Sequence, residues 1–317
     1  MSVKKLLAVA GVGMMVLTGC STTIEQPKDD IQAGKENVDH TTSADKINQQ
    51  EEVKKENEEP LRIVSATVSA TQLLDQLGQD LVGVPQTKFT LPERYEGVTL
   101  VGQAMNPDLE AIVALDSDLV VIDTMFKENV EKSIEAFGLN AFYFNTSTYS
   151  KFLVSIEELG EAIDKEAEAK DFIESLQAVE NTVKNKAEGQ APTVAVLFGG
   201  GENFMLATDH SYLGDLVDTT GAVNITDDLN IESDYIPFSM EQIVASNPDY
   251  ILRFAHGNLE ETKKAFDAAF DKNPAFKTLD AVKEGSIVDL DPNVFGVSAN
   301  IYIVDAIQKL GELFYGN

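Results

Sequence analysis

The alternation of strand-like and helix-like segments constrains this chain more than any other feature. Short runs rich in Val, Ile, Leu and Phe recur from residue 62 onward, and amphipathic stretches lie between most of them. This order predicts α/β organisation with mainly parallel sheets. The predicted strands are Arg62–Ala66, Leu81–Val84, Leu119–Asp123 and Ala141–Phe144 in a first set, and Val194–Phe198, Tyr250–Phe254 and Ser286–Leu290 in a second.

A long helical region separates the two sets of strands. Apolar residues recur at helical spacing from Phe152 to Ile163, and a similar stripe continues from Ile173 to Val183. The predicted organisation is therefore an N-terminal α/β lobe at residues 61–147, a long linker helix and a following helix at 148–189, and a C-terminal α/β lobe at 190–317.

An internal sequence repeat indicates that the two lobes share one architecture. The segment LEAIVA at Leu109–Ala114 aligns without gaps with MEQIVA at Met240–Ala245, and each is followed at the same distance by an aspartate and a predicted strand. The repeat gives Glu110 and Glu241 equivalent positions, one in each lobe. Two such lobes are expected to face each other across a cleft, with the ligand beyond the carboxyl ends of the strands.

The N-terminus predicts export and lipid anchoring. Lys4 and Lys5 precede the apolar run Leu6–Leu17, which is too short for a bilayer core that needs roughly 20 residues. The following L-T-G-C resembles the lipobox of bacterial lipoproteins, in which the cysteine is diacylated and becomes the mature N-terminus. We expect a lipoprotein signal peptide at 1–20 with lipidation at Cys20. The alternative is a plain signal peptide that ends in a small apolar residue.

Residues 21–60 form a second compositional zone with few large apolar side chains and many Glu, Asp, Lys, Asn and Gln residues. Such a segment does not bury enough apolar surface to offset its chain entropy, so we predict a disordered acidic tether. His40 lies inside it and is expected to be solvated. A lipid anchor followed by a tether is typical of a protein that works beside a membrane without entering it.

Charge and cysteine content exclude several functions. The formal net charge of −29 argues against a nucleic-acid partner, because phosphate binding needs a basic face. One cysteine allows neither an intramolecular disulfide nor a thiolate metal cluster. Gly199-Gly200-Gly201 lacks the Lys-Ser/Thr of a P-loop and is predicted to be a loop or turn. No Ser-His-Asp set or carboxylate pair stands out, so we do not predict an enzyme.

Of the three histidines, His256 stands where a ligand of a bound molecule is expected. It follows the predicted strand Tyr250–Phe254 and precedes Gly257, so it falls on the cleft side. A loop residue without a ligand role is the alternative. A dedicated zinc or manganese site needs several converging ligands, whereas haem needs only one or two axial side chains, so a single histidine suits haem. His210, beside residue types that cap helices, is predicted to be exposed at a helix start.

If haem is the ligand, a thioether or a phenolate is the expected second axial group. Met205 and Met240 lie in apolar surroundings and are predicted to be core residues. Met105 and Met125 both lie in polar loops at element ends. Pseudo-symmetry favours Met125, because it holds the position equivalent to His256, but spacing does not decide between the two.

Four segments carry a resemblance to a known family. They are VGQAMNP at Val101–Pro107, LPERY at Leu91–Tyr95, the stretch Ala207–Val217, and ILRFAHG at Ile251–Gly257. Together with the lipobox, they closely resemble the Isd-type haem-receptor lipoproteins, the substrate-binding components of haem ABC importers in Gram-positive bacteria. The similarity runs from about Arg62 to the C-terminus. It implies two Rossmann-like α/β lobes joined by one long backbone helix, like class III periplasmic binding proteins, with the ligand in the interlobe cleft.

The resemblance also implies which residues hold the iron. In the family, the methionine of the G-Q-x-M-x-P motif and the histidine of the R-x-x-H-G motif are the axial iron ligands. In this sequence they are Met105 and His256, so Met125 becomes the second candidate. One haem b per chain is implied.

Contacts with the haem propionates are implied at two further places. The matching residues are Val68 and Ser69 at the start of the first helix, and Thr87 and Lys88 in the loop after the second predicted strand. A helix N-terminus offers unpaired N–H groups to an anion, which agrees with this assignment. Lys88 departs from the family pattern, which has an aromatic residue there.

The partners follow from the same resemblance. It implies a monomer on the extracellular face of a Gram-positive cell membrane that receives haem from upstream cell-wall haem carriers. Glu110 and Glu241 are similar to the glutamates that pair with arginines of the two ABC permease subunits in the wider importer family. The alternatives are a receptor for a ferric siderophore or corrinoid, which a content of three arginines makes weaker, a surface adhesion or haem-relay module, and a tetrapyrrole enzyme.

Overall fold

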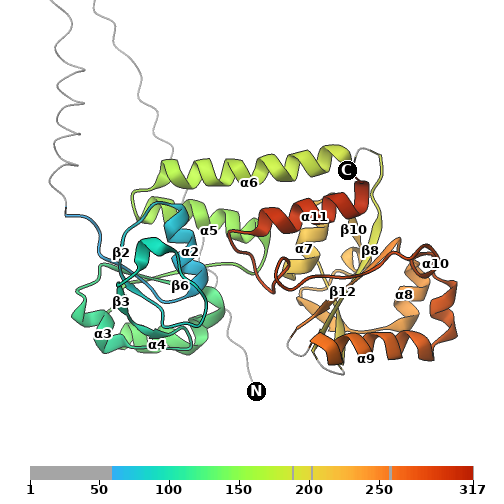
Figure 1. The fold of residues 1–317 in the computed structure, drawn as a ribbon, viewed down its shortest axis with the longest axis horizontal. Coiled ribbons are helices and arrows are strands. Elements are labelled where there is room, and N and C mark those ends of the chain that lie inside the picture. Colours follow the sequence, from blue (N-terminus) through green and yellow to red (C-terminus); the bar gives the residue numbers. More distant parts are fainter. Residues whose placement is uncertain (1–58, 188, 201–202, 257–258, 317) are drawn as a thin grey trace, which may run out of the picture. The chain divides into compact units, whose positions relative to one another are not determined.

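Strands and helices alternate through the part of the chain that the computed structural model describes (Figure 1). The structure describes residues 59–187, 189–200, 203–256 and 259–316, which belong to one compact unit. The predicted signal peptide, Cys20 and nearly all of the predicted tether lie outside the described residues. Within the described part, no helix is both long and apolar enough to cross a membrane.

The N-terminal lobe combines short strands with helices on both faces of a sheet. Its strands are β1 (Ile63–Ser65), β2 (Leu81–Val84), β3 (Thr99–Leu100), β4 (Gly102–Gln103), β5 (Asn106–Pro107), β6 (Leu119–Asp123) and β7 (Ala141–Phe144). Its helices are α2 (Val68–Gln76), α3 (Leu109–Ala114) and α4 (Lys127–Ala136), with short 3-10 turns η1 (Glu93–Tyr95) and η2 (Thr124–Phe126). The sheet has the order β3-β2-β1-β6-β7, and β4 and β5 form a separate hairpin.

Both faces of this sheet are buried. Val120 and Ile122 belong to one buried cluster with Ile112 of α3 and Val130 of α4. Val121, between them, belongs to a different cluster on the opposite face. Successive side chains of a strand point to opposite faces, so a strand covered on both sides reads as a continuous apolar run. This is why β6 was recognisable from the sequence.

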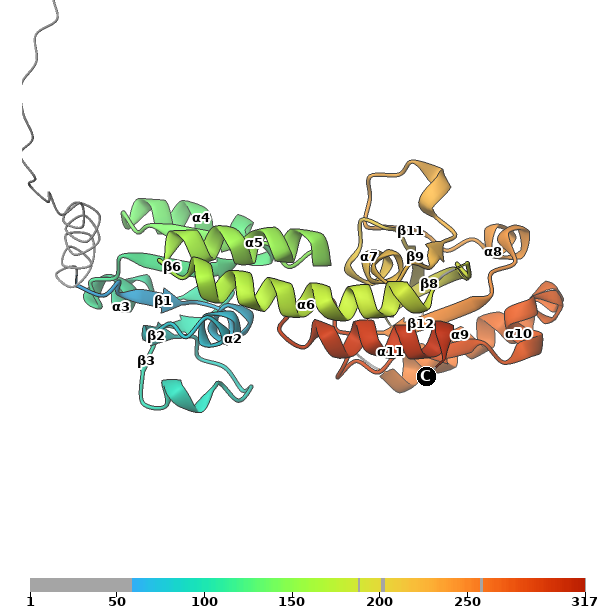
Figure 2. The ribbon, with the colours of Figure 1, turned by 90° about the horizontal axis from the view of Figure 1, so that it is seen from above.

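Two helices connect the lobes. They are α5 (Tyr149–Ala162) and α6 (Glu166–Lys186), separated by a break at which Asp164 has a φ of 55°. The 21-residue α6 packs against α5 and against α11 (Ile303–Tyr315) of the C-terminal lobe, and Figure 2 shows it running alongside both. A glycine lies at each crossing, because a Cβ at Gly160 would lie 2.5 Å from Ala169 and one at Gly311 would lie 2.7 Å from Val183.

The C-terminal lobe has a mixed sheet with the order β11-β9-β8-β12-β13, and β10 also pairs with β8. Its strands are β8 (Thr193–Gly200), β9 (Asn203–Ala207), β10 (Val223–Asn224), β11 (Tyr235–Pro237), β12 (Tyr250–Ala255) and β13 (Ile287–Asp289). Its remaining helices and 3-10 turns are α7 (Tyr212–Thr219), η3 (Asp227–Leu229), α8 (Met240–Ser246), α9 (Leu259–Lys272), η4 (Pro274–Thr278) and α10 (Asp280–Glu284). The pairings of β9 with β8 and with β11 are antiparallel, and the others are parallel.

The predicted glycine loop is wrong at its first two residues. Gly199 and Gly200 are the last residues of β8 and pair with β9 across an antiparallel hairpin. A Cβ at Gly199 would lie 2.8 Å from Phe266 and 2.8 Å from Thr262, both on α9. Glycine therefore lets the helix lie against the strand, which is a packing requirement and not a turn signal.

The predicted burial of Met205 is also wrong, since 38% of this residue is exposed. It lies in β9, where its neighbour Leu206 is fully buried. The run Phe204-Met205-Leu206 is therefore a strand with alternating faces and not a continuous core segment. Met240, at the start of α8, is partly buried and packs against a buried cluster of the lobe, in agreement with the prediction.

The internal sequence repeat is also a structural repeat. Asp118, before β6, accepts a hydrogen bond at 2.7 Å from the N–H of Arg62 at the start of β1. Asp249, before β12, accepts one at 2.7 Å from the N–H of Thr193 at the start of β8. Each aspartate thus joins the beginnings of two adjacent parallel strands. The repeat, which rests on four identical residues in the aligned segments and the aspartate that follows, therefore extends to an equivalent backbone contact in each lobe.

Candidate ligand site at the carboxyl ends of the strands

The N-terminal sheet gathers its candidate residues along one edge. All its strand pairings are parallel, so the carboxyl ends of the strands meet at the same edge. The strand order changes direction between β1 and β6, and open α/β sheets bind ligands beside such a switch point. The candidate residues follow the strands in turn: Val68 and Ser69 after β1, Thr87 and Lys88 after β2, Met105 in the β4–β5 hairpin that follows β3, and Met125 after β6.

Val68 and Ser69 form the first turn of α2, as predicted. Thr67 caps this helix, because its hydroxyl oxygen accepts from the N–H of Ala70 and its carbonyl accepts from that of Thr71. The first N–H groups of a helix have no partner within the helix. Those of Val68 and Ser69 are therefore the ones that this cap leaves for an anion.

Asp123 is a site residue that the sequence analysis missed. It ends β6 and is only 2% exposed. Its carboxylate accepts hydrogen bonds from the hydroxyls of Ser69 at 3.2 Å and Thr146 at 2.8 Å, and from the N–H of Met125 at 3.0 Å. Burial raises the pKa of Asp123, and these hydrogen bonds oppose the rise. An acidic residue at the end of the buried run LVVID was the available signal, since a buried carboxylate needs such donors.

The loop that carries Thr87 and Lys88 follows β2 and contacts the β4–β5 hairpin. The N–H of Gln86 donates to the carbonyl of Gly102 at 2.6 Å. The Thr87 hydroxyl accepts from the N–H of Phe89 at 3.1 Å, and Phe89 itself is 75% exposed. Lys88 is exposed. The loop therefore holds a hydroxyl, an ammonium group and an uncovered aromatic ring beside the hairpin.

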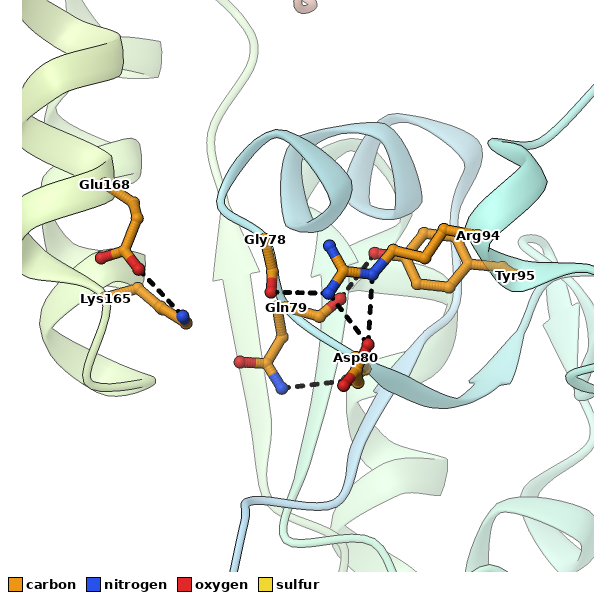
Figure 3. A network of polar contacts seen from close by, with 7 residues as sticks. All are labelled: Gly78, Gln79, Asp80, Arg94, Tyr95, Lys165 and Glu168. Atoms are coloured by element: carbon orange, nitrogen blue, oxygen red, sulfur yellow. Dashed lines mark hydrogen bonds and ion pairs between the residues drawn. The ribbon is translucent and has the colours of Figure 1, made fainter. Parts of the chain in front are cut away.

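The LPERY motif fixes the far end of this loop, as Figure 3 shows. The guanidinium of Arg94 donates to the carboxylate of Asp80 at 2.9 Å and to the carbonyl of Gly78 at 2.8 Å. The buried hydroxyl of Tyr95 donates to the carbonyl of Gln79 at 2.7 Å. The motif thus anchors the loop to the turn between α2 and β2, which is a structural role.

The two candidate methionines differ in their polar contacts. Met105 lies in the turn of the β4–β5 hairpin and is 63% exposed. Its sulfur accepts from the side-chain amide of Asn129 on α4, with 3.7 Å between Nδ2 and Sδ. Met125 lies in η2 and is 60% exposed. Among the described residues, its thioether has no such polar contact.

His256 directly follows β12, as predicted, and is exposed. Its N–H donates to the carbonyl of Gly199 at 2.8 Å, which continues the pairing with β8. Its ring lies 6.0 Å from the ring of Phe198 at an interplanar angle of 23°. The ring of Tyr235, on β11, lies 4.7 Å from the same Phe198 ring. His210 is exposed directly before Ser211, the N-cap of α7, which confirms that prediction.

The structure joins candidates of the N-terminal lobe in two separate pairs, and it joins none across the two lobes in the described residues. Ser69 and Met125 share Asp123, and the loop of Thr87 is bonded to the hairpin of Met105. No contact between His256 and either candidate methionine is found in the described residues. In the same residues, no three His, Cys, Asp or Glu side chains come together as metal ligands.

Glu110 and Glu241 occupy equivalent places. Each is the second residue of its helix, after the N-caps Asp108 of α3 and Ser239 of α8, and each is exposed. Beside Glu110 is an open hollow of about 670 Å³. Besides Glu110, it is lined by Gln86, Gly102, Gln103, Asn106, Pro107, Asp108, Leu109 and Phe137. Its wall thus includes the hairpin whose turn carries Met105.

Comparison with known families identifies the class of protein. The model of the periplasmic binding protein family matches residues 63–294, which is most of the chain and includes both sheets. The chain therefore belongs to the periplasmic binding protein family. The two α/β lobes expected from the sequence are the fold of that family.

Particular relatives narrow the assignment. The chain is 34% identical over 257 residues to the high-affinity heme uptake system protein IsdE of Staphylococcus aureus strain MRSA252, covering 80% of this chain and 87% of the relative. The crystal structure of S. aureus IsdE complexed with heme has a TM-score of 0.68 at 34% identity, covering 81% of this chain and 100% of that chain. An ABC transporter substrate-binding protein from Listeria monocytogenes EGD-e gives 0.72 at 32% identity, covering 82% and 100%.

Proposed function

We propose that this chain is a membrane-anchored haem receptor that delivers haem to an ABC permease for iron acquisition. The observation that carries the proposal is the pair Met105 and His256. A thioether and an imidazole are exposed beyond strand ends, one in each lobe, in a chain similar to proteins named for heme uptake. Both groups are common axial ligands of haem iron. In this proposal they bind the iron of one haem b from opposite sides.

The propionates of the haem are assigned to the N-terminal lobe. The N–H groups of Val68 and Ser69 donate to one propionate carboxylate. The Ser69 hydroxyl does not take part, because it already donates to Asp123. The Thr87 hydroxyl accepts from Phe89, which leaves its hydrogen free to donate to a second carboxylate. Lys88 adds a positive charge in place of the aromatic residue of the family pattern.

The apolar faces of the porphyrin need apolar cover, which contributes about 25 cal/mol for each Å² removed from water. The ring of Phe198 beside His256 and the ring of Tyr235 beside Phe198 are suited to this on the C-terminal lobe. Phe89, 75% exposed beside the propionate residues, is suited to it on the N-terminal lobe. These aromatic side chains are the proposed walls of the site.

Glu110 and Glu241 are the proposed contacts with the permease. They are exposed at equivalent positions of the two lobes, so they suit a partner with two equivalent subunits. The hollow beside Glu110 offers room for a side chain of that partner, and arginine is the residue that pairs best with a carboxylate.

Replacing Cys20 with alanine is expected to release the protein from the membrane or to stall its processing. The reason is that lipid attachment at this residue is the proposed anchor, and two acyl chains are needed for stable anchoring. Labelling of cells with a radioactive fatty acid, followed by fractionation, measures both effects. A Cys20→Ala protein that still carries lipid would exclude this anchor.

An anchored receptor on the extracellular face is placed to take haem from cell-wall carriers.

A chain that begins at Arg62 is expected to bind one haem as a monomer. Residues 59–317 form one compact unit, so removal of the preceding segment is expected to leave both lobes intact. Titration followed by absorbance should saturate at one equivalent with a six-coordinate haem spectrum. Parallel titrations with a ferric siderophore and a corrinoid should show no binding. Saturation at two equivalents, or preference for either of those ligands, would contradict the proposed function.

A further inference from the structure

Asn129 is the polar neighbour of the Met105 sulfur in the described part of the chain, and the proposed function gives this contact a purpose. Asn129 is the third residue of α4, a helix that packs against strand β5 of the hairpin. Its amide nitrogen lies 3.7 Å from Sδ, within the range of a hydrogen bond to sulfur. Asn129 lies 24 positions from Met105 and in another element, so the contact depends on the tertiary fold.

A thioether sulfur has two lone pairs. An amide donor that occupies one of them leaves the other for a metal ion and fixes the direction in which it points. Methionine needs such help, because its three rotatable bonds let the sulfur adopt many positions on an exposed hairpin. Groups that hydrogen-bond to a metal ligand orient that ligand and tune the metal.

We propose that Asn129 is a positioning residue for Met105, which it orients toward the haem iron and holds there. This inference rests on the proposed function and deepens it. It also separates the two candidate methionines, since the Met125 thioether has no comparable donor within the described residues. The hydrogen bond draws electron density from the sulfur, which favours reduced iron, so its loss should lower the reduction potential of the bound haem.

The test uses the full-length protein, purified in detergent and loaded with haem. Asn129→Leu keeps the approximate size and removes the donor. Imidazole is added as a competitor for the methionine side of the iron, and its rate of entry should rise roughly threefold to tenfold, the factor expected for one lost hydrogen bond. The reduction potential should fall, and the methionine-to-iron charge-transfer band should weaken. Asn129→Asp, which has the same shape but no amide donor, should raise the rate of imidazole entry as the leucine variant does, and its negative charge should lower the reduction potential further.

Two controls make the test specific. Asn140→Leu removes another exposed amide of the same lobe, one that donates to the carbonyl of Asp118, and should change neither rate nor potential. In a Met105→Ala background, Asn129→Leu should have no further effect, because Asn129 acts through that sulfur.

The outcomes are distinct. A wild-type protein that binds no haem would overturn the proposed function, and this inference with it. A wild-type protein with methionine-ligated haem that Asn129→Leu leaves unchanged would overturn this inference alone. An Asn129→Leu effect that persists without Met105 would also overturn it.

Discussion

Replacing His256 with alanine is expected to lower haem affinity by more than about a hundredfold. Loss of a group that merely supports a metal ligand costs roughly 10-fold to 100-fold in affinity, and loss of a strong ligand such as imidazole should cost at least as much. The N–H of His256 bonds to Gly199 through the backbone, so the substitution leaves that contact in place. The measurement is the rate at which loaded protein loses haem to a scavenging haem protein.

Met105→Ala provides the first comparison for this result. A thioether is a weak iron ligand that water replaces, so this variant should retain haem and lose less than about tenfold in haem affinity. The spin state of the iron should change, and its reduction potential should be lower. Met125→Ala should leave all three unchanged. If Met125→Ala alters the spin state and Met105→Ala does not, Met125 is the ligand. His210→Ala, which removes another exposed histidine of the same lobe, should have no effect.

The sequence predicted the strands that are covered on both faces. β2, β6 and β7 have the predicted bounds, because a continuous apolar run between turn residues has few alternative structures. The antiparallel strands β9 and β11 were missed. β9 has one face buried at Leu206 and one exposed at Met205, so its apolar residues read as a short core segment.

The candidate site was predictable to the extent that it follows from strand ends. In a parallel sheet the residues after each strand meet at one edge, so Ser69, Thr87 and Met125 could be grouped without a structure. The contacts among these residues could not. Asp123 bonds to Ser69 from 54 positions away, and Asn129 bonds to Met105 from 24. Such pairs depend on how helices pack on the sheet, which hydrophobic patterns alone do not define.

Changing both Glu110 and Glu241 to alanine is expected to abolish haem import while leaving the haem spectrum and affinity nearly unchanged. Both carboxylates are exposed in the first turns of α3 and α8, apart from the residues proposed to hold haem. Truncating one partner of a charge pair that an interface shields from water costs roughly 2–5 kcal/mol. Two such losses would weaken docking at least about a thousandfold, since 1.4 kcal/mol is about tenfold.

The measurement is haem-dependent growth of cells that carry the double variant at normal surface abundance, beside the spectrum of the purified protein. Glu128→Ala with Glu260→Ala is the matched control, because these are also exposed first-turn glutamates, one in each lobe. The control should grow normally, since exposed helix charges without a partner contribute little. The growth of each single variant should fall between that of the wild type and that of the double variant, because one of the two contacts with the permease remains. Normal growth of the double variant would show that docking does not depend on these carboxylates, and equal defects in variant and control would point to a general charge effect.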